Sequence, residues 1–238
     1  MLRRHRSALT FVGVVLLLAG LLAAGLYGVD RWAQNGVERQ VAKNLQMALE
    51  TPSEPQVSID GFPFLTQVAT RNIRQVHVVA DDVGATGENA LSLAQVDLLL
   101  SEVTTTDWFE TMTASHIEGT GLIDYAALEH VATVPVSYAG DGRIRVETTA
   151  TLFGAKVVAQ ITGSPRLERG EQAITLGDPT IKVAGVDLPD FTATALLRTV
   201  VKPIPLRGLP LSLAVTSISA EADGLRVGVA GDDVPLQG

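Results

Sequence analysis

The amino-acid sequence predicts an α+β protein in which a long helical region is followed by an antiparallel β-sheet. Residues 8–29 form an uncharged apolar run, and residues 30–50 place apolar side chains at helical spacing. From residue 72 onward, short segments of alternating apolar and polar residues are separated by turn sequences. Such alternation is typical of antiparallel sheets that bury one face.

The apolar run, ALTFVGVVLLLAGLLAAGLYGV, predicts a membrane span. A helix of 22 residues rises about 33 Å, close to the ~30 Å hydrocarbon thickness of a bilayer. Three arginines within the first six residues precede it, and such clusters stay in the cytoplasm. We therefore expect residues 1–29 to form a cytoplasmic tail and a single transmembrane anchor in the cytoplasmic membrane. Residues 30–238 are then expected to lie in the periplasm or cell envelope.

A cleaved signal peptide is the alternative interpretation of residues 1–29. LLAAG, at residues 21–25, would supply the small residues that precede a cleavage site. The apolar run is longer than a usual signal core and lacks a clean A-x-A site, so we favour the anchor. Both interpretations export the rest of the chain.

The exported part is acidic. The tail contains three of the 18 basic residues and none of the 26 acidic ones, so residues 30–238 have 15 basic and 26 acidic side chains, a formal charge of −11. Negative charge repels nucleic acid and anionic lipid surfaces. Nucleic acid is therefore not an expected partner, and any lipid must be held mainly by apolar burial. The chain has no cysteine, which excludes disulfides and thiolate metal sites.

The helix predicted over residues 30–50 is amphipathic. Polar residues Arg39, Lys43, Gln46 and Glu50 lie opposite an apolar side made of Ala33, Val37, Val41, Leu45, Ala48 and Leu49. The sequence TPSEP at residues 51–55 ends the helix, because proline excludes its predecessor from the helical region.

Residues 57–59 predict a strand, which the sequence GFPFL at residues 61–65 then breaks. Large apolar side chains are usually buried, so Phe62, Phe64 and Leu65 are expected to plug one end of the core. The functional alternative is that they line an apolar ligand groove or touch a bilayer. They are therefore candidate lipid contacts.

The remaining strands are predicted at residues 76–80, 91–100, 117–123, 144–152, 156–162, 173–176, 180–183, 209–215, 218–222 and 225–230, and residues 138–143 are predicted to form a hairpin. A change in the phase of alternation near Ala94 suggests a bulge. Asp141-Gly142 and Asp223-Gly224 predict hairpin turns. Asp81-Asp82 and Asp232-Asp233 are interpreted as solvated turns.

Two further helices are predicted, at residues 124–130 with Asp124 as the N-cap, and at residues 190–202 between two prolines. The turn at residues 107–110 contains Trp108 and Phe109. These aromatic side chains either staple the turn to the sheet or contact a membrane interface, where tryptophan is favoured.

The sequence contains no recognisable catalytic or metal-binding motif. Its four histidines lack metal-ligand spacing, and H-E-x-x-H, G-x-S-x-G and a glycine-rich phosphate loop are missing. We therefore expect a binding protein without a cofactor rather than an enzyme. The alternatives are an anchored scaffold for a protein partner and, less favoured, a hydrolase with a dispersed site.

Several short motifs carry a family resemblance. They are V-x-I-D-G-F-P-F-L-T-Q at residues 57–67, Gly119-Thr120-Gly121 leading to Tyr125-x-x-Leu128, Leu209-Pro210-Leu211, and D-G-L-x-V-x-V-x-G-x-D-V at residues 223–234. In these motifs the sequence resembles the actinobacterial LmeA-type phospholipid-binding envelope proteins, over most of residues 30–238.

The resemblance implies a tubular lipid-binding fold, with a long helix cradled by a strongly curved antiparallel sheet that encloses an apolar groove. It also implies binding or transfer of a phospholipid or phosphoinositide, and a part in building envelope lipids or lipoglycans. Arg71, Arg74 and Arg198 are the candidate headgroup ligands, should a basic pocket exist.

Overall fold

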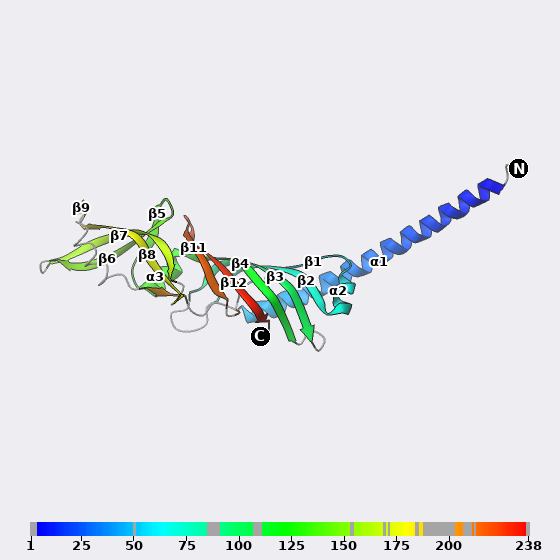
Figure 1. The fold of residues 1–238 in the computed structure, drawn as a ribbon. Helices are drawn as coiled ribbons and strands as arrows, with labels where there is room; N and C mark the ends of the chain where they lie inside the picture. The colour runs from blue at the N-terminus through cyan, green and yellow to red at the C-terminus, as the bar shows by residue number, and fades with distance from the viewer. Residues whose placement is uncertain are drawn as a thin grey trace.

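The computed structural model describes residues 4–49, 51–84, 91–106, 111–152, 155–168, 170, 172–183, 186–187, 203–206, 211 and 213–236. It confirms the α+β class, because a long N-terminal helix is followed by antiparallel sheets (Figure 1). The helices are α1 (Arg4–Ala48), α2 (Phe64–Thr70) and α3 (Tyr125–Ala132).

The described strands form two sheets, where the resemblance implied one. Sheet A has the order β1-β2-β3-β4-β12-β11, and sheet B has the order β10-β8-β7-β6-β5, with β9 also paired to β8. The bounds are β1 (Gln56–Asp60), β2 (Asn72–Val83), β3 (Leu93–Thr106), β4 (Thr111–Asp124), β5 (Val136–Gly140), β6 (Arg143–Leu152), β7 (Ala155–Glu168), β8 (Ala173–Val183), β9 (Val186–Asp187), β10 (Ile204–Pro205), β11 (Ala214–Ala220) and β12 (Gly224–Pro235).

The apolar run and the amphipathic segment are one uninterrupted helix, α1. No proline occurs before residue 52, so nothing in the sequence forces a break between the two segments. The first part projects away from the body with its described leucines exposed, whereas the last part lies along sheet A (Figure 1). Leu49 of the predicted apolar side is buried there, and Ala33, Val37 and Leu45 are partly buried against the core. Ala42, which is not part of that predicted side, is also buried.

Sheet A has two distinct ends. At the end nearer the predicted anchor, residues 8–29, which we call the anchor-proximal end, Asn72 pairs with Thr104 directly after α2. At the anchor-distal end, Val83 pairs with Leu93, and the next amide, that of Gly84, donates to the carbonyl of Leu49 near the end of α1. The 12 residues of β2 separate these ends by about 36 Å, at 3.3 Å per step.

Two predicted turns are in fact parts of strands. Asp82 lies within β2 and Asp233 within β12, and their positive φ angles of 52° and 50° accompany changes in the burial alternation. The phase change near Ala94 is confirmed, because Leu93 and Val96 are both buried. The pairing between β2 and β3 keeps one register throughout, so no extra residue is inserted there.

Other local predictions agree with the structure. The hairpin at Asp141-Gly142 joins β5 and β6, and the hairpin before β12 is closed by a bond from the Glu221 amide to the Gly224 carbonyl. Asp124 caps α3 by accepting from the Ala127 amide at 2.6 Å. Helix α2 was not predicted. The predicted helix at residues 190–202 and the turn at residues 107–110 lie outside the described residues.

Candidate functional site

A cavity of about 400 Å³ opens between α3 and sheet B. Its volume is within the range of ligand sites, which are typically apolar with a few polar groups. None of the lining side chains is charged, and the polar ones are threonines. The space can therefore shelter hydrocarbon, and it offers no ion pair to an anionic group.

Strand β6 shows how the sequence builds this lining. Side chains alternate between the two faces of a strand, so Ile144, Val146 and Thr148 line the cavity together. Glu147 points to the other face, where it accepts from Gln160 of β7 at 3.0 Å. Helix α3, β5, β8, β10 and β12 contribute further apolar residues to the lining, among them Leu128, Ile174 and Leu225.

Helix α3 is fixed beside the cavity by hydrogen bonds at both ends. The Tyr125 hydroxyl donates to the Glu221 carbonyl at 2.7 Å, and the Val136 amide donates to the Glu129 carboxylate at 3.1 Å. Burial of the phenol raises the pKa of Tyr125 to about 12. The Glu221 carboxylate also binds Arg226 at 2.7 and 2.8 Å, which lowers the Glu221 pKa.

The raised pKa predicts an alkaline effect that a Tyr125→Phe variant should remove. The unfolded chain loses this phenolic proton near pH 10 and the folded chain near pH 12, so the contribution of Tyr125 to stability falls as pH rises above about 10. We expect the thermal midpoint to fall less steeply between pH 10 and 12 in the variant than in the wild type. Below pH 9 the variant should be less stable by about 1 kcal/mol, because it lacks the bond to Glu221. Equal slopes would contradict the assignment.

A network of hydrogen bonds, which we call the joint, connects Asp30, Gln34 and Glu38 of α1 to α2 and β1 at the anchor-proximal end. Asp30, only 3% exposed, accepts from the amides of Phe64 at 2.9 Å and Leu65 at 2.8 Å. These amides begin α2 and have no partner within that helix. A carboxylate is favoured at this position by the helix dipole. Asp30, a residue of α1, therefore caps the N-terminus of α2.

Gln34 and Glu38 extend the joint along the same face of α1, since four-residue spacing keeps side chains on one side. Gln34 donates to the Ile59 carbonyl at 2.6 Å, and Glu38 accepts from the Ile59 amide at 2.8 Å. Together they bind both backbone groups of one residue of edge strand β1. The sequence reasoning missed this role. The available signal was polar residues at positions 30, 34 and 38, interrupting an otherwise apolar face.

Gly61 is required by the same joint. Its φ of +106° is unfavourable for other residues, and a Cβ there would lie 2.7 Å from the Gln67 Nε2. Gln67 is buried, donates to the Asp60 carbonyl at 3.1 Å and accepts from the Arg74 amide at 2.9 Å. The GFPFL motif is thus the structural connection between β1 and α2.

The predicted contact residues separate into different environments. Phe64 is buried in the core at 1% exposure, as the plug interpretation requires, whereas Phe62 is 56% exposed and Leu65 is 44% exposed. The plug interpretation is therefore wrong for Phe62 and Leu65. The Phe62 ring lies 5.6 Å from that of Tyr27. None of these residues lines the cavity, which lies at the other end of sheet A, where Leu225 of β12 lines it.

The candidate headgroup ligands Arg71 and Arg74 are exposed beside α2 and do not line the cavity. Arg198, Trp108 and Phe109 lie outside the described residues. Lipid contact by any of the predicted residues stays a prediction.

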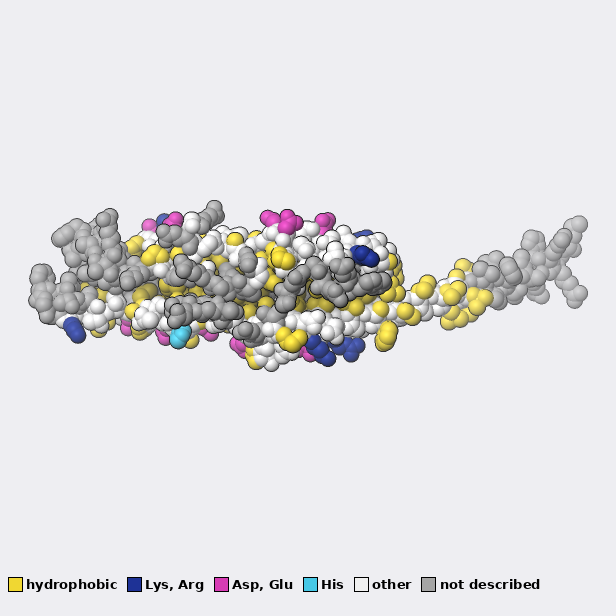
Figure 2. All heavy atoms as spheres, turned by 90° about the horizontal axis from the view of Figure 1, so that it is seen from below, with side chains coloured by type: hydrophobic (Ala, Val, Ile, Leu, Met, Phe, Trp, Pro, Cys, Tyr) yellow, Lys and Arg dark blue, Asp and Glu magenta, His cyan; other side chains and the backbone are white. Residues whose placement is uncertain are grey.

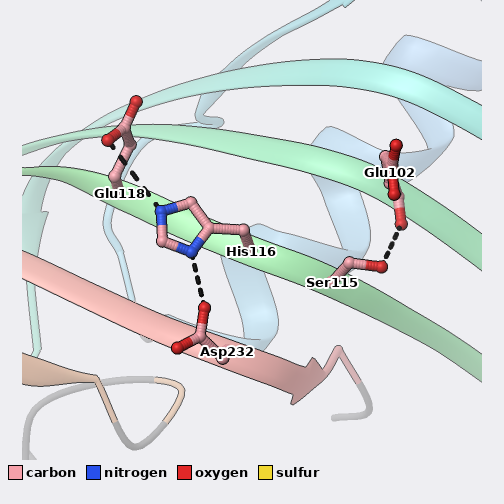
Figure 3. Close-up of polar contacts among 5 residues, drawn as sticks. All are labelled: Glu102, Ser115, His116, Glu118 and Asp232. Carbon is pink, nitrogen blue, oxygen red and sulfur yellow. Dashed lines mark hydrogen bonds and ion pairs between the residues drawn. The ribbon is translucent and has the colours of Figure 1, made fainter.

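Histidine–carboxylate pairs lie on the exposed face of sheet A. His77 is 2.7 Å from Asp97, and His116 lies between Asp232 at 2.7 Å and Glu118 at 3.9 Å (Figure 3). Such exposed pairs contribute about 0–1 kcal/mol. No group of three or more histidine, aspartate or glutamate side chains within the described residues is arranged to hold a metal.

A comparison with protein families agrees with the apolar character of the cavity. The profile of the LmeA-like phospholipid-binding family matches residues 28–230, from the last residues of the apolar run to β12. Comparisons with curated proteins and with solved structures return no significant match. The family match covers most of the chain, and the chain therefore belongs to the LmeA-like phospholipid-binding family.

Proposed function

We propose that this protein is a membrane-anchored, extracytoplasmic phospholipid-binding protein whose cavity takes the acyl chains of its ligand. The observation that carries the proposal is the charge-free apolar cavity in a chain of a phospholipid-binding family. At about 0.8 kcal/mol per buried CH₂, a dozen sheltered methylenes supply on the order of 10 kcal/mol before the costs of binding. The acidic body needs no headgroup attraction to achieve useful affinity.

Helix α1 supports the anchoring part of the proposal. In the described residues, the stretch Leu16–Met47 includes a window apolar enough to cross a membrane, and almost none of that window is buried in the protein. The arginines before it favour a cytoplasmic N-terminus and a periplasmic domain. A signal sequence has the same composition, and it would also export residues 30–238. The extracytoplasmic location of the domain is therefore expected with either interpretation, whereas the anchor requires that residues 1–29 are retained.

The position of the cavity favours lipid transfer over simple retention. The part of α1 from Asp30 to Leu49 spans about 29 Å, and the cavity lies beyond its far end. Acyl chains held there have left the bilayer that α1 crosses. A protein that withdraws a phospholipid or phosphoinositide completely can present it to envelope lipid or lipoglycan assembly, and it needs no catalytic residues to do so.

A matched pair of threonines tests the cavity. Thr148 lines it, whereas its neighbour Thr149 is exposed on the opposite face of β6. We expect Thr148→Trp to reduce the fraction of lipid-bound protein by about tenfold, because the indole occupies the space of several methylenes. Thr149→Trp should leave that fraction unchanged. Native mass spectrometry of the full-length protein, released from membranes, measures co-purified phospholipid in each variant.

The rival function, a scaffold without a ligand, makes the opposite prediction. Wild-type protein would then carry no lipid, and neither tryptophan variant would differ from it. Thermal unfolding of both variants distinguishes a filled cavity from a misfolded domain. Both variants should keep a cooperative transition, and only Thr148→Trp should lose lipid.

A further inference from the structure

We infer that the anchor-proximal end of the domain is a bilayer-docking surface, formed by Phe62 and Leu65 together with the exit region of α1. The inference rests on the proposed anchoring of α1 and goes beyond it. It assigns the domain a second, direct contact with the membrane that α1 crosses. Its occupant is the boundary between lipid headgroups and acyl chains.

The distribution of exposed apolar side chains is the first observation. Within the described residues, every exposed large hydrophobic side chain except Met47 and Val158 lies either on α1 between residues 16 and 32 or at Phe62 and Leu65. Phe62, and Leu65 in the first turn of α2, lie next to this part of α1, because Phe62 contacts Tyr27 and the Leu65 amide is bound by Asp30. Figure 2 shows hydrophobic side chains where α1 leaves the body. A patch that is continuous with a membrane span is most simply covered by the same membrane.

The hydrogen bonds of Asp30 set the depth of this patch. Asp30 directly follows the apolar run, and its carboxylate holds the amides of Phe64 and Leu65. The start of α2 is therefore fixed at the level where α1 leaves the hydrocarbon. The contact between the rings of Tyr27 and Phe62, 5.6 Å apart, places Phe62 at the same level.

The polar residues around the patch fit an interface. Tyr27 and Trp32 flank the exit point, and aromatic residues of this kind are enriched at the headgroup level. Arg31 lies over the Tyr27 ring, 5.6 Å from its centroid. Arg71 and Arg74 follow α2, and basic side chains are visible beside the end from which α1 projects (Figure 2). Lys and Arg at such positions attract lipid phosphates even where the protein as a whole is acidic.

This contact would hold the domain in one orientation. A single helix crossing a bilayer leaves the attached domain free to tilt, whereas two neighbouring contacts at the same depth restrict that tilt. The cavity would then be kept at a fixed distance from the membrane surface.

Environment-sensitive labels test the docking surface in the full-length chain. The sequence has no cysteine, so Leu65→Cys and Val158→Cys each give a unique labelling site. The control site is 58% exposed and apolar, and it lies on β7 of sheet B. Each variant is labelled with a nitrobenzoxadiazole fluorophore and reconstituted in vesicles of phosphatidylcholine and phosphatidylglycerol. We expect blue-shifted emission and quenching by nitroxide-labelled lipid at position 65, and neither effect at position 158.

Separate readouts keep this inference distinct from the proposed function. Resistance to carbonate extraction reports the anchor, and co-purified lipid reports the cavity. A membrane-inserted protein whose position-65 label is quenched only from the aqueous phase would overturn the docking surface and leave the anchor intact. A label shielded from both quenchers would also overturn it, because a protein partner would then cover the patch. Carbonate-extractable protein would overturn anchor and docking together. Phe62→Cys provides a second site should Leu65→Cys fold poorly.

Discussion

Replacing Phe64 by alanine should destabilise the domain by about 3–5 kcal/mol, the usual cost of deleting a fully buried phenylalanine. Its ring is 1% exposed and belongs to one continuous core that extends from the end of α1 through sheet A to α3 and sheet B. Truncation would leave a cavity beneath the start of α2 that the joint cannot readily close. Denaturant unfolding of the full-length protein in detergent, followed by the far-ultraviolet signal of the strands, measures this loss.

Phe62→Ala is the matched control, two residues away in the same motif. Because its ring is 56% exposed, we expect this variant to lose less than about 1 kcal/mol. Equal losses at the two positions would mean that Phe62 is buried against the domain in solution. The docking surface would then lack its central aromatic residue.

Local sequence patterns predicted much of the fold because their causes are local. Asp141-Gly142 forms a tight hairpin because both residues adopt positive φ, at 50° and 68°. Asp124 caps α3 because its side chain reaches an amide three residues away. The alternating strands are recognisable because each buries only one face. These relations involve neighbours in the chain, so a single sequence contains them.

The joint and the cavity could not be predicted in this way. Asp30 acts on Phe64 and Leu65 across 34 and 35 positions, and nothing near Asp30 indicates that α2 exists. Phe62 and Phe64 have identical side chains, and only the tertiary structure separates an exposed ring from a buried one. The cavity is assembled from α3, β5, β6, β8, β10 and β12, so its lining residues run from Leu128 to Leu225 along the chain.

The resemblance to a family supplied the lipid-binding expectation but assigned no residue to the ligand. Its most distinctive motif, GFPFL, builds the joint next to the anchor and does not line the cavity. A motif can be distinctive because its backbone conformation tolerates few residue types. Here a glycine with positive φ packs against a buried glutamine. It is followed by a helix that is capped by a residue from elsewhere in the chain.

Asp30→Ala should cost about 2–3 kcal/mol, although the residue touches no ligand and lies outside the cavity. The substitution removes the acceptor of two amides at the start of α2, one of which, that of Phe64, is in a buried hydrogen bond. Buried donors left without an acceptor lose their hydrogen bonds to water on folding and form no replacement in the protein. Helix α1 itself should remain helical, because its own backbone bonds do not involve this side chain. Unfolding experiments identical to those for Phe64 measure the loss.

Two variants separate capping from a general effect of charge. Asp30→Asn keeps one acceptor oxygen in a side chain of the same size, so it should recover roughly half of the loss. Asp60→Ala removes an exposed carboxylate close by and should change stability by less than about 0.5 kcal/mol. If Asp30→Asn were as unstable as Asp30→Ala, the negative charge at the start of α2 would matter more than the hydrogen bonds. If neither were destabilised, α2 would be held by the burial of Phe64 alone, and the depth of the docking surface would no longer be set by Asp30.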